Sequence, residues 1–173
     1  MNWRIDEDSD IGNLQNIGDG FLLSAIDLAK RCLTDNDHKE ADILIFPIFN
    51  NANHGIELYL KVLNLLFSKL LNLEVKIDKS HNIQKLFESV KAKAKDYKGN
   101  FSFKDFKDST KNLESYIDEL FKMIKPVTKN DRMDFSRYPF TNNHENHFYV
   151  NSFGKSFEID LLRGRWRLPR SRR

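Results

Sequence analysis

The chain contains very little cysteine, glycine and proline, and each scarcity excludes a class of protein. Cys32 is the only cysteine among 173 residues, so no disulfide can form within the chain and a reducing compartment is expected. Seven glycines and four prolines are too few for the many turns of an all-β protein. A hydrophobic share of 40% and a charged share of 31% are typical of a globular chain, not a disordered one. The composition therefore predicts a mainly helical, cytoplasmic protein.

The sequence also lacks a long apolar run and a recognisable targeting segment. Its first ten residues, MNWRIDEDSD, are acidic where a signal peptide is basic and then apolar. A membrane-spanning helix needs about 20 mostly apolar residues. The best stretch is interrupted by four polar residues, which are Asn64, Ser68, Lys69 and Asn72. We therefore expect no membrane association.

Motifs for metal ions, phosphates and activated serines are missing as well. No H-x-x-x-H or C-x-x-C spacing occurs, and His144 and His147, next to Glu145, lie in a turn-rich stretch that is more typical of a solvated surface. No glycine-rich phosphate loop and no G-x-S-x-G motif is present. The sequence thus predicts neither a metal site nor a cofactor site.

The most prominent pattern that is present runs from Ile43 to Leu73. Apolar residues recur there every three or four positions, as on one broad face of a helix. These residues are Ala52, Ile56, Tyr59, Leu60, Leu63, Leu66, Phe67 and Leu70. Pro47 either starts this helix or kinks one that begins earlier, and we favour the kink because apolar residues before it continue the pattern. So long and apolar a helix must be covered by other helices.

Three shorter helical patterns can supply that cover. They span Phe21–Leu33, His81–Ala94 and Lys111–Ile124, with caps expected at Asp19, at Ser80 and at Ser109 or Thr110. Residues 1–20 are expected to form an arm or a short first turn, and residues 101–106 an irregular aromatic segment. After Pro126, residues 127–143 read as a loop, and residues 147–159 predict a small β-hairpin with a glycine turn. The fold class predicted is an all-α bundle of four to five helices with a small C-terminal β-hairpin.

The last eleven residues differ sharply from the rest. Arg163–Arg173 holds six arginines and no acid, and without them the formal charge of +3 would become −3. We interpret residues 1–162 as one helical domain and residues 163–173 as a basic tail. The tail is either a truncated or non-native end, or a basic arm that binds a phosphate backbone while Trp166 stacks on a base.

Two polar features remain as candidate sites. Glu57 and Lys61 are four residues apart, which is either an ordinary pair on a helix surface or a sign that Glu57 anchors a cation such as Arg137 across the bundle. The second feature is Arg137, followed after six residues by His144. Such a pair can cleave RNA without metal if the histidine moves the proton and the arginine stabilises charge on the phosphate. The alternative is that Arg137 holds its loop to the bundle through Glu57 or backbone carbonyls.

Three segments together resemble the HEPN superfamily, the helical-bundle domains of prokaryotic toxin–antitoxin, phage-defence and RNA-processing systems. The segments are HGIELYLKVLNLL, SHNIQKLFESV and DFSRYPFTN. Their motifs are E-L-x-x-K (Glu57, Leu58 and Lys61), H-N-x-x-K-L (His81, Asn82, Lys85 and Leu86) and R-Y-P (Arg137, Tyr138 and Pro139). The match covers about residues 40–160.

The resemblance implies an up-and-down bundle that is usually a homodimer. In active members an arginine and a histidine with four to six residues between them form a metal-independent endoribonuclease site across the dimer interface, and Arg137 and His144, with six residues between them, meet that spacing at its upper limit. Tyr138 and Pro139 follow the arginine where active members usually have a polar residue, which fits a member that binds without cutting. We therefore expect either an RNA-cleaving component with an antitoxin or other operon partner, or a non-catalytic module that binds RNA, a nucleotide or a partner protein. In the second case Glu57, Lys61, His81 and Tyr138 serve as a structural or binding network.

Overall fold

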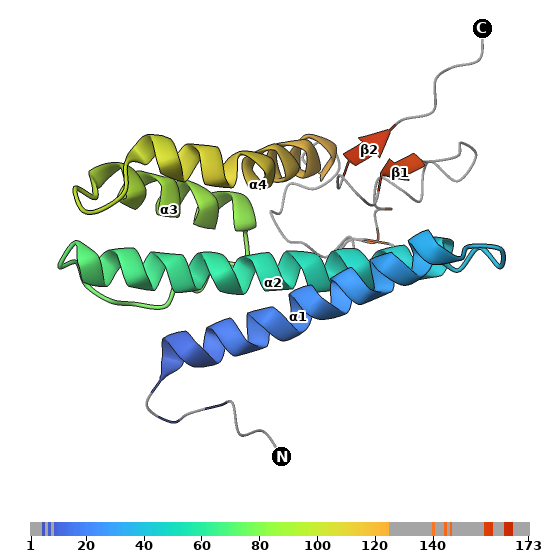
Figure 1. Ribbon diagram of the computed structural model, residues 1–173, viewed down its shortest axis with the longest axis horizontal. Coiled ribbons are helices and arrows are strands. Elements are labelled where there is room, and N and C mark those ends of the chain that lie inside the picture. Colours follow the sequence, from blue (N-terminus) through green and yellow to red (C-terminus); the bar gives the residue numbers. More distant parts are fainter. Residues whose placement is uncertain are drawn as a thin grey trace, which may run out of the picture.

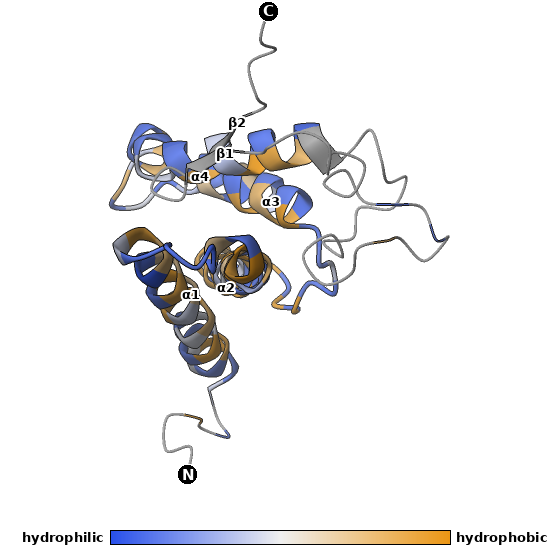
Figure 2. Ribbon diagram, turned by 90° about the vertical axis from the view of Figure 1, so that its right-hand side faces the viewer, coloured by the Kyte–Doolittle hydropathy of each residue, from blue (hydrophilic) through white to orange (hydrophobic). Residues whose placement is uncertain are grey.

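The longest helix, α2 (Ala41–Leu70), lies between the other helices, as Figure 1 shows for the computed structural model of the chain. The residues described are 5, 7, 9–124, 140, 144, 146, 158–160 and 165–167. α1 (Asp10–Thr34) runs along one side of α2, whereas α3 (Ile83–Asp96) and α4 (Phe103–Ile124) lie on the other side (Figure 2). The predicted helical bundle, organised around this one segment, is therefore confirmed.

α2 begins before Pro47, as expected, and ends at Leu70 instead of near Leu73. The proline removes the hydrogen bond to the carbonyl of Ile43. Because Ile43 is 73% exposed, water can replace that lost donor. Further along, apolar residues on several sides of the helix are buried, among them Leu60, Val62 and Leu65, so α2 is covered around most of its circumference.

α1 begins eleven residues earlier than predicted. The side chain of Ser9 accepts a hydrogen bond from the backbone N–H of Gly12 at 3.2 Å, so Ser9 and not Asp19 is the N-cap. Asp19 lies inside the helix and accepts a hydrogen bond from the hydroxyl of Tyr59 on α2. The expectation of an arm or a short first turn over residues 1–20 was thus wrong from Asp10 onwards.

The caps of α3 and α4 also differ from the prediction. Asn82 caps α3 by accepting from the N–H of Lys85, and Ser80 instead accepts from the N–H of Asn82. α4 begins at Phe103 and not at Lys111, because Ser102 caps it: its hydroxyl accepts from the N–H of Asp105. The aromatic segment 101–106 is therefore largely helical, and neither Ser109 nor Thr110 is a cap.

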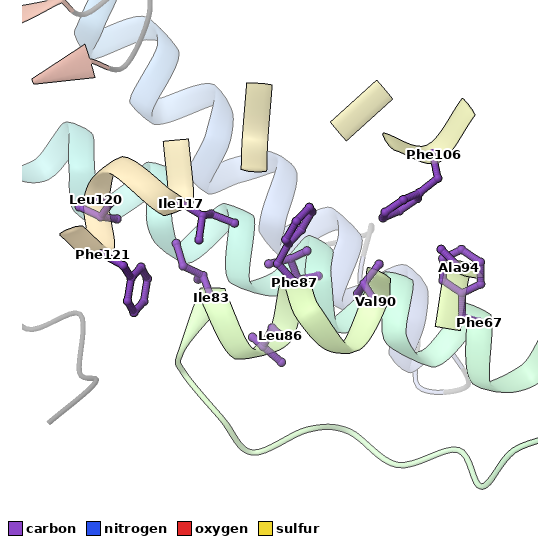
Figure 3. Packing of buried hydrophobic residues seen from close by; sticks show 11 residues of the cluster. Phe67, Ile83, Leu86, Phe87, Val90, Ala94, Phe106, Ile117, Leu120 and Phe121 are labelled. Atoms are coloured by element: carbon purple, nitrogen blue, oxygen red, sulfur yellow. The ribbon is translucent and has the colours of Figure 1, made fainter. Parts of the chain in front are cut away.

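The core is formed where α2, α3 and α4 meet (Figure 3). Its buried residues are Leu60, Phe67, Ile83, Leu86, Phe87, Val90, Ala94, Phe106, Ile117, Leu120 and Phe121. Helical spacing predicts a buried stripe for each of the third and fourth helices, namely Ile83, Leu86, Phe87 and Val90, and Leu113, Ile117, Leu120 and Phe121. All of these residues belong to the cluster except Leu113, which packs against it and is only partly buried. Phe106 packs on Phe67 and Phe87, which gives the aromatic segment its place in the core.

Consecutive helices of an up-and-down bundle run antiparallel, and α2 and α3 depart from this order because they run parallel. Hydrogen bonds join Glu57 to His81, Asn64 to Ser89 and Ser68 to Lys93, so residue numbers rise together and α2 and α3 run parallel. The connector, residues 71–82, returns along α2 to make this possible (Figure 1). α1 and α4 both run antiparallel to α2. Asp19 and Leu22 of α1 lie against Tyr59 and Gly55, and Phe106 and Tyr116 of α4 lie against Phe67 and Asn53, so residue numbers fall on α2 as they rise on its neighbour.

A two-stranded antiparallel sheet lies near the end of the described chain. β1 (Glu158–Asp160) pairs with β2 (Arg165–Arg167), with Ile159 opposite Trp166. The hairpin predicted over residues 147–159 lies mostly outside the described residues. Its last two positions, 158 and 159, pair with residues 167 and 166, which belong to the segment interpreted as a tail. β2 lies beside α4 (Figure 1).

Candidate functional site

A stripe of buried polar side chains follows one face of α2. Its members recur every three or four residues and are at most 7% exposed: Asn53, Glu57, Lys61, Asn64 and Ser68. Polar side chains are costly to bury unless they find partners. This stripe, which we name the α2 polar stripe, meets α3, α4 and the residues just before α3, so its partners lie inside the bundle.

Glu57 and Lys61 form an ion pair at the middle of the stripe. Nζ of Lys61 donates to Oε1 of Glu57 at 2.8 Å, and the two side chains are only 8% and 6% exposed. The interpretation of this pair as an ordinary surface pair was therefore wrong. A buried carboxylate of this kind must be compensated by several donors.

His81 supplies a second partner from outside α2. Its Nδ1 lies 3.0 Å from Oε1 of Glu57, while 73% of its side chain is exposed. The carboxylate fixes one edge of the ring and leaves the remainder to solvent. A histidine held in this way by a carboxylate can accept or donate a proton at its free nitrogen. Glu57 thus holds His81 across the bundle. The interpretation that Glu57 anchors Arg137 concerns a residue outside the described part of the chain and stays a prediction.

His54 approaches the same carboxylate from the turn before it on α2. Its Nδ1 lies 3.7 Å from Oε2 of Glu57, and its ring meets the ring of Phe21 on α1 edge to face, with centroids 4.4 Å apart. The contact with Phe21 holds the imidazole against α1. Two histidines and one lysine therefore surround a single buried carboxylate.

The stripe continues towards the C-terminal end of α2 as a hydrogen-bonded network with α3. Ser89 donates to Oδ1 of Asn64 at 2.8 Å, and Nζ of Lys93 donates to the Ser68 hydroxyl at 2.8 Å. Lys93 also reaches the backbone carbonyl of Asn64. These bonds fix the register of α3 on α2 and so help to position His81 at the start of α3.

At the other end of the stripe, the hydroxyl of Tyr116 on α4 donates to Oδ1 of Asn53 at 2.7 Å. Burial raises the pKa of Tyr116 far above its ordinary value, so the hydroxyl stays neutral and remains a donor. Nδ2 of Asn53 is buried and has no hydrogen-bond partner within the described residues.

Asn53, Asn64, Ser68 and Tyr116 belong to the site but were not predicted from the sequence. The signal available for the first three was their spacing: together with Glu57 and Lys61 they recur at helical intervals on an otherwise apolar helix. In the sequence, Asn64 and Ser68 stand out only as polar residues that interrupt a possible membrane-spanning helix. Nothing in the local sequence marks Tyr116, which lies 63 residues from its partner.

The predicted pair of Arg137 and His144 is not brought together by the part of the chain that the structure describes. Arg137, Tyr138 and Pro139 lie outside the described residues. His144 is exposed and has a left-handed backbone, with φ of 59°, and its ring lies 5.7 Å from that of Phe140. The hypothesis that this pair acts on RNA stays a prediction.

Within the described residues, no three side chains of His, Cys, Asp or Glu gather as metal ligands. None of the helices described has both the length and the apolar character needed to cross a membrane. Comparison with family models, with curated proteins and with solved structures gives no match for this chain.

Proposed function

We propose that the protein is a HEPN-like component of a prokaryotic defence or toxin–antitoxin system that acts on RNA. One observation carries this proposal: two of the three motifs behind the resemblance meet at a single carboxylate. Glu57 and Lys61 belong to the first motif and His81 to the second, and Oε1 of Glu57 contacts both Lys61 and His81. Short motifs matched by chance would have no reason to share a hydrogen-bonded site.

In this proposal the protein is a metal-independent endoribonuclease that works as a homodimer. His144 takes the proton of a ribose 2′-hydroxyl or protonates the leaving oxygen, and Arg137 stabilises the charge that develops on the phosphate. The products carry a cyclic phosphate. Glu57, Lys61 and His81 hold the start of α3 on α2 and so maintain the scaffold that presents the loop with Arg137.

A second candidate function is a non-catalytic module that binds RNA, a nucleotide or a partner protein. Lys61 and His81 both contact the Glu57 carboxylate inside the bundle, so this cluster holds the start of α3 on α2. A structural role of this kind favours the non-catalytic module. Tyr138 and Pro139, which follow Arg137, also fit a member that does not cut.

The deciding experiment incubates the purified full-length chain with labelled single-stranded RNA, with and without a metal chelator. Cleavage that survives the chelator, leaves cyclic phosphate ends and disappears in His144→Ala and Arg137→Ala supports the enzyme. His38→Ala is the matched control, because His38 is an exposed histidine in the turn between α1 and α2. RNA bound but uncut supports the module. A chain that neither cuts nor binds RNA overturns the proposal that it acts on RNA.

A further inference from the structure

The connector between α2 and α3 has the residue pattern of a β-strand, but within the described residues it is not paired with any strand. Residues 73–79, which we name the connector edge, read LEVKIDK, with apolar residues at 73, 75 and 77 and charged residues between them. This alternation is typical of a half-buried β-strand. The segment is assigned neither to a helix nor to a sheet, and Figure 3 shows it looping away from the buried cluster.

The side chains of the connector edge already lie as they would in a strand. Nζ of Lys76 pairs with the carboxylate of Glu74, two residues earlier, which places both on one face. Val75 and Ile77 line the same shallow groove, together with Ile11 of α1 and Leu65 of α2. One face of the segment is therefore charged and solvated, and the other is apolar.

The apolar side chains are only partly covered, and the backbone is open. Leu73, Val75 and Ile77 are between 45% and 49% exposed. The backbone hydrogen bonds recorded for this segment lie at its ends: Leu73 donates to the carbonyl of Ser68, and Ser80 donates to the side chain of Asp78. Within the described residues, the N–H groups from Glu74 to Lys79 donate to no backbone acceptor. A row of open backbone groups beside apolar side chains is a template for pairing with another strand.

We propose that the connector edge pairs antiparallel with the connector edge of a second copy of this chain, about a two-fold axis at Val75. In this register Val75 lies opposite itself and Leu73 opposite Ile77, so the apolar face continues across both chains. On the other face each Glu74 lies opposite a Lys76, and directly opposed unlike charges stabilise an antiparallel pair. The same patch serves both copies, as a closed two-fold dimer requires.

Neighbouring registers lack this complementarity. An axis at Lys76 would place Glu74 opposite Asp78, which is a like-charge contact. An axis at Ile77 would place Val75 opposite Lys79, an apolar residue opposite a charged one. The sequence of the connector edge therefore selects a second copy of itself, and one register, as its partner. This interface is separate from the dimer interface at which the resemblance places the site of Arg137 and His144.

Disulfide trapping tests the register directly. In a Cys32→Ala background, Val75→Cys places two cysteines opposite each other with Cα atoms about 5 Å apart, which is within disulfide reach. The matched control is Ile77→Cys, whose two copies would lie about 13 Å apart in the same register. We expect oxidation to link the Val75→Cys chains covalently into dimers and to leave the Ile77→Cys chains without a covalent link, as seen on a non-reducing gel. A mixture of Leu73→Cys and Ile77→Cys chains should link. Equal linking of Val75→Cys and Ile77→Cys, or no linking of either, overturns the proposal.

Charge reversal tests the same pairing without new covalent bonds. Glu74→Lys and Lys76→Glu each place like charges opposite one another, and each should weaken dimerisation about tenfold in sedimentation equilibrium. The double variant restores both pairs with reversed signs and should return to the affinity of the unmodified chain. These side chains are more than 70% exposed, so the fold is not at risk. A chain that stays monomeric at every concentration, or a dimer that none of these variants weakens, overturns the proposal.

Discussion

Nδ1 of His81 lies 3.0 Å from Oε1 of Glu57, and this bond joins the middle of α2 to the residues that start α3. The same oxygen accepts from Lys61 at 2.8 Å. The carboxylate is buried, whereas most of the histidine is in solvent. The pair thus links a site inside the bundle to its surface.

Removal of the Glu57 carboxylate should be costly because it leaves the ammonium of Lys61 buried without a counter-charge. We expect Glu57→Ala to lower the free energy of unfolding by about 3–5 kcal/mol in urea denaturation. The double variant Glu57→Met with Lys61→Met removes both charges, and it should recover most of that loss. If Glu57→Ala lowers the free energy of unfolding no more than an ordinary surface substitution does, the ion pair is solvated. The interpretation that it holds α3 on α2 is then wrong.

Gly55 allows α1 and α2 to approach closely. A Cβ at this position would lie 2.6 Å from Cγ of Leu22 and 3.2 Å from the carbonyl oxygen of Gly18 on α1. Gly55→Ala should therefore push the helices apart and destabilise the protein by about 1–3 kcal/mol, as measured by thermal unfolding.

Gly20 is the matched control, since a Cβ there would meet no atom within 4 Å. Gly20→Ala should stabilise the protein by about 0.5–1 kcal/mol, because alanine restricts the unfolded chain and favours the helix. Equal effects of the two substitutions would mean that helix propensity, and not the approach of α1 to α2, decides the outcome at Gly55.

Tyr116 joins α4 to the α2 polar stripe through Asn53. Tyr116→Phe leaves the buried amide of Asn53 without its donor and should cost about 1–3 kcal/mol of unfolding free energy. Asn53→Leu combined with Tyr116→Phe replaces both partners by apolar groups and should cost less than the two single changes added together. A double-mutant cycle measures this difference. Strict additivity would show that the hydrogen bond contributes nothing.

The start of α4 should respond to acid. The hydroxyl and the backbone N–H of Ser102 both donate to Asp105, and these bonds hold the pKa of that carboxyl below its ordinary value. Because the folded-state pKa is the lower one, the stabilisation is complete above the ordinary aspartate pKa of about 4 and is lost as the pH falls through the folded value. Asp105→Asn should therefore lower the melting temperature at neutral pH and have a shrinking effect in acid.

Thr110→Ala is a control on the same helix. Its hydroxyl donates to the carbonyl of Phe106, a bond with no titrating acceptor, so any effect of this substitution should not change between neutral and acid conditions. A pH-independent effect of Asp105→Asn would contradict the interpretation that the ionised carboxylate of Asp105, by accepting from Ser102, stabilises the start of α4.

The sequence predicts a bundle of four to five helices around a central one, and the described residues form four. Apolar periodicity identifies the buried residues of α3 and α4, but of the apolar face predicted for α2 only Leu60 and Phe67 are buried, and Leu66 and Leu70 are exposed.

The prediction fails at the starts of α1 and α4. Gly18 and Gly20 look like helix breakers, yet Gly18 is buried inside α1 against Tyr59, where a Cβ would lie only 3.1 Å from the tyrosine ring. Local residue preferences favour a turn there, and packing between two helices overrides them.

The sequence predicts only the local part of the site, because residue spacing identifies neighbours on one helix and not contacts between helices. Helical spacing indicates that Glu57 and Lys61 are neighbours, but it does not indicate that they are buried. His81 lies 24 residues away, and the parallel course of α3 along α2 alone brings it to the carboxylate. That course depends on the connector running back along α2, and the short-range patterns that identify helices carry no information about the direction of the next one.

The parallel step between α2 and α3 divides the molecule into two helical hairpins. α1 and α2 are joined by a short turn, as are α3 and α4, and each hairpin is built from contacts that are close in sequence. The connector between the two hairpins, residues 71–82, is largely exposed and makes few of the hydrogen bonds that hold the bundle together. A protease cut within residues 73–79 should therefore leave two fragments that stay associated through the buried face of α2. The same two pieces, produced separately, should reassemble when they are mixed.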